Sequence, residues 1–163
     1  MDGSAALDSA ASLGLTLDVD DRTFYDHAVE RCRDLGVVLP TFAQLADPST
    51  MPSSARRALT GADAQAPDAR NLFRVHWYND AARTGMVPVP AHVVLPEALT
   101  GVPSPVVVLF GDRFPMIHAH KVLAAYGCLV PRVITGTFDP TMHRALWPST
   151  GNYCRGGVAI SRI

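Results

Sequence analysis

The feature that most constrains this fold is a pattern in residues 105–163, where apolar runs alternate with loops and helix-like segments. The run Val106–Leu109 leads into a loop over residues 111–117, and a helical pattern follows from residue 118 to about Tyr126. A β-branched run followed by a loop of glycine, aspartate and proline and then by a helix is typical of an α/β unit. We therefore predict a buried strand at 106–109 and a helix after it.

The same order of elements occurs a second time. Val130–Ile134 predicts the next strand. Asp139-Pro140 predicts the start of a helix that ends near Leu146, because aspartate is a common cap and proline fits the first helical position. Residues 147–152 then lead into another helix N-terminus. The predicted fold class is α/β, with helices that follow parallel strands.

The first 95 residues are instead rich in helix and loop signals. We predict two regions, a helical and loop-rich N-terminal extension over residues 1–95 and an α/β segment over residues 96–163. Asp21–Gly36 is expected to be a helix, because Phe24, Ala28, Cys32 and Leu35 fall on one stripe. We expect the first few residues of the chain to be disordered.

Shorter elements are expected between this helix and the α/β segment. Residues 42–46 predict a short helix, and residues 71–79 alternate in a way that predicts a strand packed through Phe73, Val75 and Trp77. Prolines within residues 87–96 favour an extended segment at a sheet edge. Residues 96–101 predict a single helical turn that ends at a glycine.

Composition narrows the function classes. The chain of 163 residues is 48% hydrophobic and 18% charged with a formal net charge of -1, which gives no basic footprint for nucleic acid. No apolar run approaches the ~18–20 residues of a membrane span. The acidic N-terminus does not resemble a signal peptide, and the three cysteines form no CxxC pair. We expect a cytoplasmic protein that binds neither nucleic acid nor membrane.

The chemistry of the last third centres on Lys121 and on the turn Ser149-Thr-Gly-Asn152. Both lie at predicted helix N-termini, which present free N–H groups and a partial positive charge to an anionic group. Burial next to such a terminus favours the neutral amine that Schiff-base chemistry requires. Gly156-Gly157 predicts close helix packing rather than a phosphate cradle.

The pairing of Lys121 with Ser149-Thr-Gly-Asn-Tyr153 resembles the fold-type II pyridoxal phosphate enzymes, which include cysteine synthase, threonine synthase, threonine dehydratase and tryptophan synthase β. The spacing of thirty-one residues between Lys121 and Asn152 is close to the spacing in that family. Residues 99–109 are similar to the segment that enters the lysine loop in threonine-synthase-like members. The resemblance covers roughly residues 95–163. It implies an incomplete three-layer αβα unit of this fold, preceded by the helical extension.

The resemblance also implies roles for individual residues and a cofactor, pyridoxal 5'-phosphate. Lys121 would form the internal aldimine and transfer the proton, and Asn152 would contact the ring hydroxyl of the cofactor. Ser149, Thr150, Gly151 and Tyr153 would hold the carboxylate of an amino-acid substrate. The implied reaction is β-elimination or β-replacement, as in cysteine synthase. Members of the family are often dimers, so the resemblance implies a homodimer.

Two departures from the family pattern mark this chain. Ala119-His-Lys-Val-Leu123 stands where the family has Ser-x-Lys-Asp-Arg, so the acidic and basic residues after the lysine are absent. The phosphate-binding glycine loop of the family comes well after the asparagine turn, whereas this sequence ends at Ile163, eleven residues past Asn152. We therefore expect an N-terminal fragment of a longer enzyme that is inactive alone.

Other interpretations stay open. The segment could be a non-catalytic α/β binding or subunit module in which Lys121 is incidental, or a small hydrolase that uses Ser149, although the Gly-x-Ser-x-Gly elbow is missing. His118 and His120 could suggest a metal pair, but no third ligand is evident, and we predict no metal site.

Overall fold

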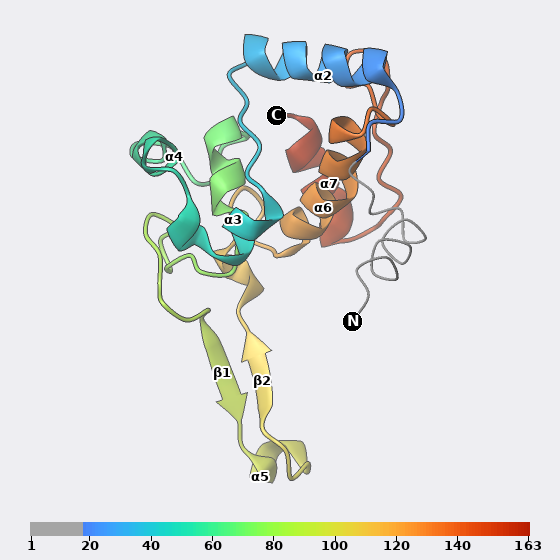
Figure 1. Cartoon of the computed structure of the whole chain (residues 1–163). Helices are drawn as coiled ribbons and strands as arrows, with labels where there is room; N and C mark the ends of the chain where they lie inside the picture. Colours follow the sequence, from blue (N-terminus) through green and yellow to red (C-terminus); the bar gives the residue numbers. More distant parts are fainter. Residues whose placement is uncertain (1–17) are drawn as a thin grey trace, which may run out of the picture. The chain divides into compact units, whose positions relative to one another are not determined.

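The computed structural model describes residues 18–163, so the expectation of disorder at the start of the chain lies outside the described residues. The described part is a mixed α and β structure (Figure 1). Its α-helices are α2 (Arg22–Asp34), α3 (Phe42–Ala46), α4 (Ser53–Ala58), α5 (Glu97–Thr100), α6 (Lys121–Ile134) and α7 (Asn152–Ser161). Its strands are β1 (His92–Leu95) and β2 (Val106–Leu109), and its 3₁₀ helices are Pro48–Thr50, Ala69–Arg74 and Gly111–Arg113.

The chain forms two compact units. Unit 1 consists of residues 18–36 and Tyr126–Leu146, and unit 2 consists of Val37–Ala125 and Trp147–Ile163. Helix α6 begins in unit 2 and continues into unit 1. All residues that were predicted to form the functional site lie in unit 2.

Unit 1 is built around helix α2, which confirms the helix predicted from the apolar stripe. The side chain of Asp21 caps α2 by accepting a hydrogen bond from the Phe24 N–H at 3.0 Å. The ring of Phe24 lies edge-on to the ring of His143, 5.2 Å between centroids. The backbone N–H of Asp20 donates to the Thr135 carbonyl at 2.7 Å. Contacts to the segment after α6 therefore hold α2 in place.

A buried aspartate joins the same two parts of unit 1. The Asp139 carboxylate is fully buried and accepts from His27 Nδ1 at 2.8 Å and from the Thr141 N–H and hydroxyl. Burial alone would raise the pKa of Asp139, but the hydrogen bonds from Thr141 and His27 outweigh this effect and lower it to about 2. The hydrogen bond to Asp139 raises the pKa of His27 above its usual value of 6.5.

Two predicted elements in unit 1 are wrong. The predicted strand Val130–Ile134 is the last part of α6, which continues through Pro131. Tyr126 and Val130 are buried there on one helical face, so tertiary packing overrides the β propensity of this run. The helix predicted from Asp139 to Leu146 is a turn followed by irregular structure, because Thr141 takes up the Asp139 carboxylate only two residues on.

Unit 2 contains most of the buried apolar side chains, including Leu72, Phe73, Val75, Phe114, Val122, Ala125 and Ile160. Helix α3 forms where predicted, with a capping box in which Thr41 and Gln44 satisfy each other's backbone N–H groups. Helix α7 also begins where predicted, directly after Gly151.

The strand predicted at residues 71–79 is wrong, because this segment is the 3₁₀ helix Ala69–Arg74 followed by turns. Polar side chains of this segment bind backbone carbonyls within it and in the preceding loop. The Asn79 amide donates to the Arg74 and His76 carbonyls at 2.8 and 2.9 Å, and the Asn71 amide donates to the Asp63 and Ala66 carbonyls. Local side-chain hydrogen bonds of this kind compete with a β ladder.

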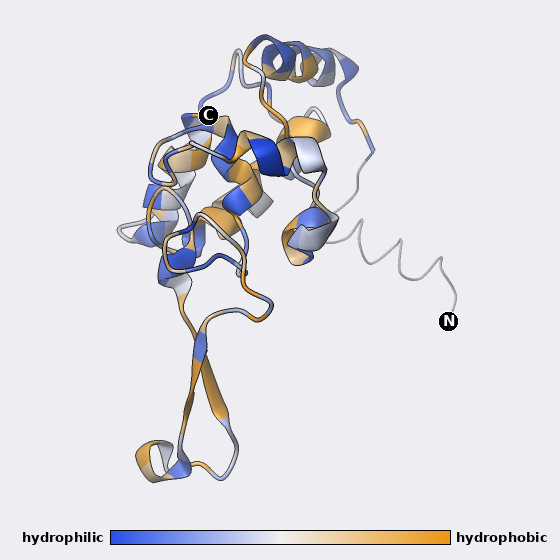
Figure 2. Ribbon diagram, turned by 90° about the vertical axis from the view of Figure 1, so that its left-hand side faces the viewer, coloured by the Kyte–Doolittle hydropathy of each residue, from blue (hydrophilic) through white to orange (hydrophobic). Residues whose placement is uncertain are grey.

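Strands β1 and β2 form a two-stranded antiparallel hairpin, in which Val93 pairs with Val108 and Leu95 with Val106. Helix α5 lies at its far end and stops at Gly101, as predicted (Figure 1). The predicted burial of Val106–Leu109 is wrong, since three of these four residues are exposed. Figure 2 shows hydrophobic residues along both strands. Within residues 18–163 no parallel strand pair forms.

Candidate functional site

Lys121 is the first residue of α6, and it is exposed. The sequence had suggested burial, which the structure does not provide. The helix begins here because Val122 and Ala125, both fully buried, anchor its first turns in the core of unit 2. The lysine therefore stands at the rim of a packed region with its amine open to approach.

The loop before Lys121 has an unusual backbone. Met116 and His118 have φ values of 64° and 52°, in the left-handed region that side chains other than glycine rarely adopt. Two such residues within three positions cost of order 1–3 kcal/mol each, and such strain persists only where the surroundings hold the chain in place. The buried side chains of Phe114 and Ile117 supply that support.

Trp77 supports this loop through aromatic contacts. Its ring stacks on His120, 5.5 Å between centroids, and meets Phe114 edge-on at 4.9 Å. Gly111 passes so close to His120 that a Cβ at this glycine would lie 2.7 Å from the His120 Nδ1. Trp77 and Gly111 therefore enclose the residue that directly precedes Lys121.

Arg83 approaches the same loop from a different segment. Its Nη1 donates to His118 Nδ1 at 3.0 Å and contacts the Asp112 carbonyl at 3.5 Å. Because arginine stays protonated, the His118 Nδ1 must act as the acceptor. Arg83 itself has a left-handed φ of 60°. The Arg83 guanidinium thus contacts His118, three residues before Lys121, in the loop of residues 111–120 that precedes the lysine (the lysine loop).

Helix α7 packs directly against the start of α6. A Cβ at Gly156 would lie 2.6 Å from the Lys121 carbonyl oxygen and 3.0 Å from the Val122 nitrogen, so only glycine fits at this contact. Asn152 is one helical turn before Gly156 on the same face of α7, about 6 Å along the axis. The first residues of α6 therefore pack against the middle of α7, one helical turn beyond Asn152.

The remaining predicted site residues lie at or before the α7 N-terminus. Ser149, Thr150 and Gly151 are exposed, and the Ser149 hydroxyl accepts from the Gly151 N–H at 3.2 Å. Asn152 is exposed, and its Oδ1 accepts from Arg155 at 2.9 Å. The cap residue of α7 is Gly151, which has no side chain that could accept from the first N–H groups of the helix.

Tyr153 is half-buried and points to a different neighbour. Its ring meets Trp147 edge-on with 5.4 Å between centroids. Trp147 also donates from Nε1 to the Ser161 hydroxyl at 3.0 Å and covers Gly157, where a Cβ would fall 2.0 Å from the indole. The prediction that Gly156 and Gly157 permit close packing is confirmed.

Sequence reasoning missed Trp77 and Arg83. Trp77 falls in the segment that alternation had assigned to a strand, and Arg83 falls in a turn between Asn79 and Gly85 with no motif around it. Their partners are more than thirty residues away along the chain. The left-handed backbone of Met116 and His118 likewise leaves no trace in residue type.

Within residues 18–163, no group of three or more histidine, cysteine, aspartate or glutamate side chains could hold a metal ion. The three cysteines are free and half-buried. None of the described helices is both long enough and apolar enough to cross a membrane. Comparison with known proteins gave no match to a family model, to a curated protein or to a solved structure.

Proposed function

We propose that this chain is part of a pyridoxal-phosphate-dependent enzyme that acts on an amino acid by β-elimination or β-replacement, with Lys121 as the cofactor-binding amine. The observation that carries the proposal is the contact between Gly156 and the Lys121 backbone, which sets the start of α6 against α7 one helical turn from Asn152. A lysine at the N-terminus of a helix that packs against a second helix, one turn from the N-terminus of that helix, suits a ligand that carries both an aldehyde and anionic groups.

The residues present fit the cofactor and an amino acid in chemical type. The Lys121 amine can bind an aldehyde, and the Asn152 amide can bond the ring hydroxyl. The hydroxyls of Ser149 and Thr150, with the positive end of the α7 dipole, can receive a carboxylate. When bound, pyridoxal phosphate supplies an electron sink for the charge that develops at the substrate Cα. Lys121 then takes and returns the Cα proton.

The proposal includes the finer fold, an incomplete three-layer αβα unit, as well as a cytoplasmic location and a homodimer. Ser149 is a weaker candidate as a hydrolase nucleophile, because its hydroxyl oxygen is engaged by the Gly151 N–H. The non-catalytic binding or subunit module stays the alternative.

The test uses the fact that Lys121 is the only lysine among the 163 residues. The chain is incubated with pyridoxal phosphate, reduced with borohydride and digested, and the adduct is located by mass spectrometry. We expect an adduct on Lys121 at cofactor concentrations that leave the N-terminal amine unmodified. Lys121→Ala removes this adduct.

A second variant separates a built site from a merely reactive lysine. Asn152→Ala keeps the amine but removes the amide, so we expect a lower yield of Lys121 adduct at the same cofactor concentration. The proposal fails if Lys121 is unmodified, or if it reacts no faster than the N-terminal amine and equally in the Asn152→Ala variant. Either result would favour the non-catalytic module.

A further inference from the structure

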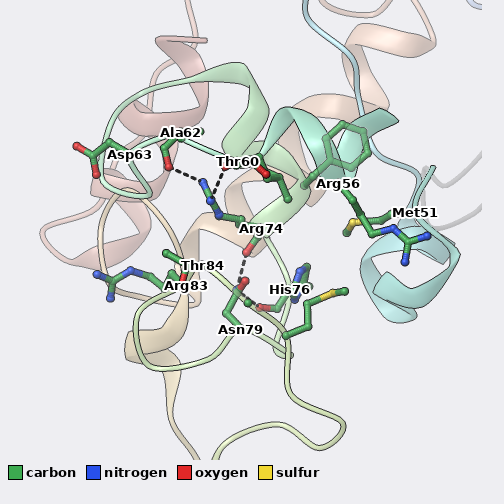
Figure 3. A pocket seen from close by; sticks show the side chains of 15 residues that line it. Met51, Arg56, Thr60, Ala62, Asp63, Arg74, His76, Asn79, Arg83 and Thr84 are labelled. Atoms are coloured by element: carbon green, nitrogen blue, oxygen red, sulfur yellow. Dashed lines mark hydrogen bonds between the residues drawn. The ribbon is translucent and has the colours of Figure 1, made fainter. Parts of the chain in front are cut away.

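A cavity of about 530 Å³ lies in unit 2, apart from the α7 N-terminus. Three stretches of chain line it, residues 51–63, 73–79 and 83–86 (Figure 3). Small-molecule sites commonly occupy about 300–1,000 Å³. We call this cavity the arginine pocket, because Arg56, Arg74 and Arg83 all contribute to its lining.

Arg74 is a buried cation without a carboxylate partner. Its side chain is only 4% exposed, and its guanidinium donates to the Ala62 carbonyl at 3.1 Å, to the Leu59 carbonyl at 3.0 Å and to Asn71 Oδ1 at 2.6 Å. No ion pair to Arg74 forms among the described residues. These neutral acceptors satisfy its N–H groups, and the carboxylates of Asp63, Asp68 and Asp80 act on its charge only through space, without direct contact. A buried charge without a contacting counter-ion is costly.

Arg83 adds a second cation on the wall that faces the lysine loop. Its partners are Nδ1 of the His118 ring and the Asp112 carbonyl, and its Nε is buried without an acceptor. Arg83 therefore also lacks an anionic partner among residues 18–163.

The rest of the lining sets the character of the ligand. Arg56 is exposed at the mouth, and Asp63 is the single carboxylate in the lining, with its side chain directed away from Arg74 in Figure 3. Three arginines against one carboxylate give the lining residues a formal excess of positive charge. Met51 and Phe73, 2% and 6% exposed, give it an apolar wall.

We propose that the arginine pocket binds a small organic anion, a carboxylate or phosphate head group on a compact apolar body. The head group compensates the charge of the arginines, and the apolar body lies against Met51 and Phe73. The proposal does not depend on pyridoxal phosphate, and its test is carried out without that cofactor.

The test measures binding of hexanoate to the whole chain by isothermal titration calorimetry at low ionic strength. We expect hexanoate to bind at millimolar or lower concentration, and hexanol, which has the same body without the charge, to bind much more weakly. Hexyl phosphate in place of hexanoate shows which head group is preferred. Added salt weakens binding, because the interaction is electrostatic and partly exposed.

Helix α4 provides a matched pair of variants. Arg56 lines the pocket and its exposed neighbour Arg57 does not. Arg56→Gln is expected to weaken hexanoate binding about tenfold, the effect of losing one charge-assisted contact, while Arg57→Gln leaves it unchanged. Arg83→Gln, as a second lining variant, also weakens it.

Two outcomes overturn the proposal. One is that hexanoate and hexyl phosphate bind no better than hexanol. The other is that they bind but with equal affinity to the Arg56→Gln, Arg83→Gln and Arg57→Gln variants, which places the anion elsewhere. Circular dichroism of each variant establishes that the fold is retained.

Discussion

Unit 2 contains two segments whose exposure is the reverse of what residue type suggests. The segment from Leu59 to Asn79 buries polar side chains, with Asn71, Arg74, His76 and Asn79 between 0% and 4% exposed. The hairpin of β1 and β2 exposes apolar ones, with Val94 and Val107 each 51% exposed and Leu109 44% exposed. The two segments belong to the same compact unit and follow each other along the chain.

The difference shows that this unit buries polar side chains where they have hydrogen-bond partners, so polarity alone does not decide which side chains are buried. Each buried polar group in the first segment has backbone or side-chain partners at 2.6–3.1 Å. The hairpin keeps its backbone pairing but gains little from side-chain burial, and a lone two-stranded hairpin is marginally stable in water. We therefore expect most of the stability of unit 2 to come from the segment Leu59–Asn79, which we call the polar segment.

The contrast between the two segments is tested most directly by a substitution at Arg74. Arg74→Ala leaves the Ala62 and Leu59 carbonyls and Asn71 Oδ1 without their donor. Because unpaired buried groups cost about 1–3 kcal/mol each, we expect a loss of about 3–5 kcal/mol in the free energy of unfolding, measured in urea. Arg70→Ala, which removes an exposed ion pair with Asp68, should cost less than about 1 kcal/mol. If Arg74→Ala and Arg70→Ala lower the free energy of unfolding equally, the buried hydrogen bonds of Arg74 are not a main source of the stability of unit 2.

The pH dependence of stability tests the same segment at His76. Burial lowers the pKa of His76 from 6.5 to about 4, against a smaller opposing effect of its hydrogen bond to the Phe73 backbone. Its Nδ1 accepts from the Tyr78 N–H, which requires the neutral ring. Between these two values the unfolded chain binds the proton and the folded chain does not. The His76 contribution is therefore fully present above about pH 6.5 and is lost as the pH falls toward 4.

The free energy of unfolding should therefore fall by about 3 kcal/mol between pH 7 and pH 4.5, measured by urea unfolding at the two pH values. In a His76→Gln variant this part of the pH dependence should disappear, whatever the variant costs at neutral pH. If the wild type and the variant lose stability in parallel on acidification, His76 is not the group responsible.

A matched pair of valines sharpens the contrast between the two segments. Val75 is 0% exposed in the polar segment, and Val94 is 51% exposed in β1. Truncation of a buried valine removes packing and leaves a cavity, so Val75→Ala should cost about 2 kcal/mol, whereas Val94→Ala should cost less than about 0.5 kcal/mol. Thermal unfolding monitored by circular dichroism distinguishes the two. A large effect at Val94 would mean that the hairpin side chains contribute to the core.

The elements that could be predicted from sequence are those with local signals. Asp21, Thr41 and Gly101 mark the ends of helices through their own caps and turns, and the helices are found there. The predictions of strands at 71–79 and 130–134 are wrong because tertiary contacts decide the structure of both segments. In the first, buried amide side chains bind backbone carbonyls. In the second, the apolar residues belong to the helical face of α6 that contains Tyr126. Strand β2 was placed correctly, but apolar content alone does not predict burial.

The residues of the candidate site also fall into those that the sequence indicated and those that it did not. Lys121 and Asn152 could be named from residue type and spacing, and Gly156 identified as a packing position. Trp77 and Arg83 could not, because each reaches the lysine loop only through the folding of the segment between Asn71 and Gly85. The pocket arginines were missed for the same reason, since a buried arginine without a carboxylate has no signature in sequence.

The paired glycines of α7 have a consequence for the helix–coil equilibrium of this segment. Gly156 and Gly157 each destabilise an isolated helix by about 1 kcal/mol relative to alanine. A helix of ten residues is already marginally stable in water. A peptide of residues 149–163 should therefore be a coil. The N–H groups that begin α7 become aligned only when Trp147 and the Lys121 backbone pack on the two glycines, so the N-terminal end of this helix depends on tertiary packing rather than on local propensity.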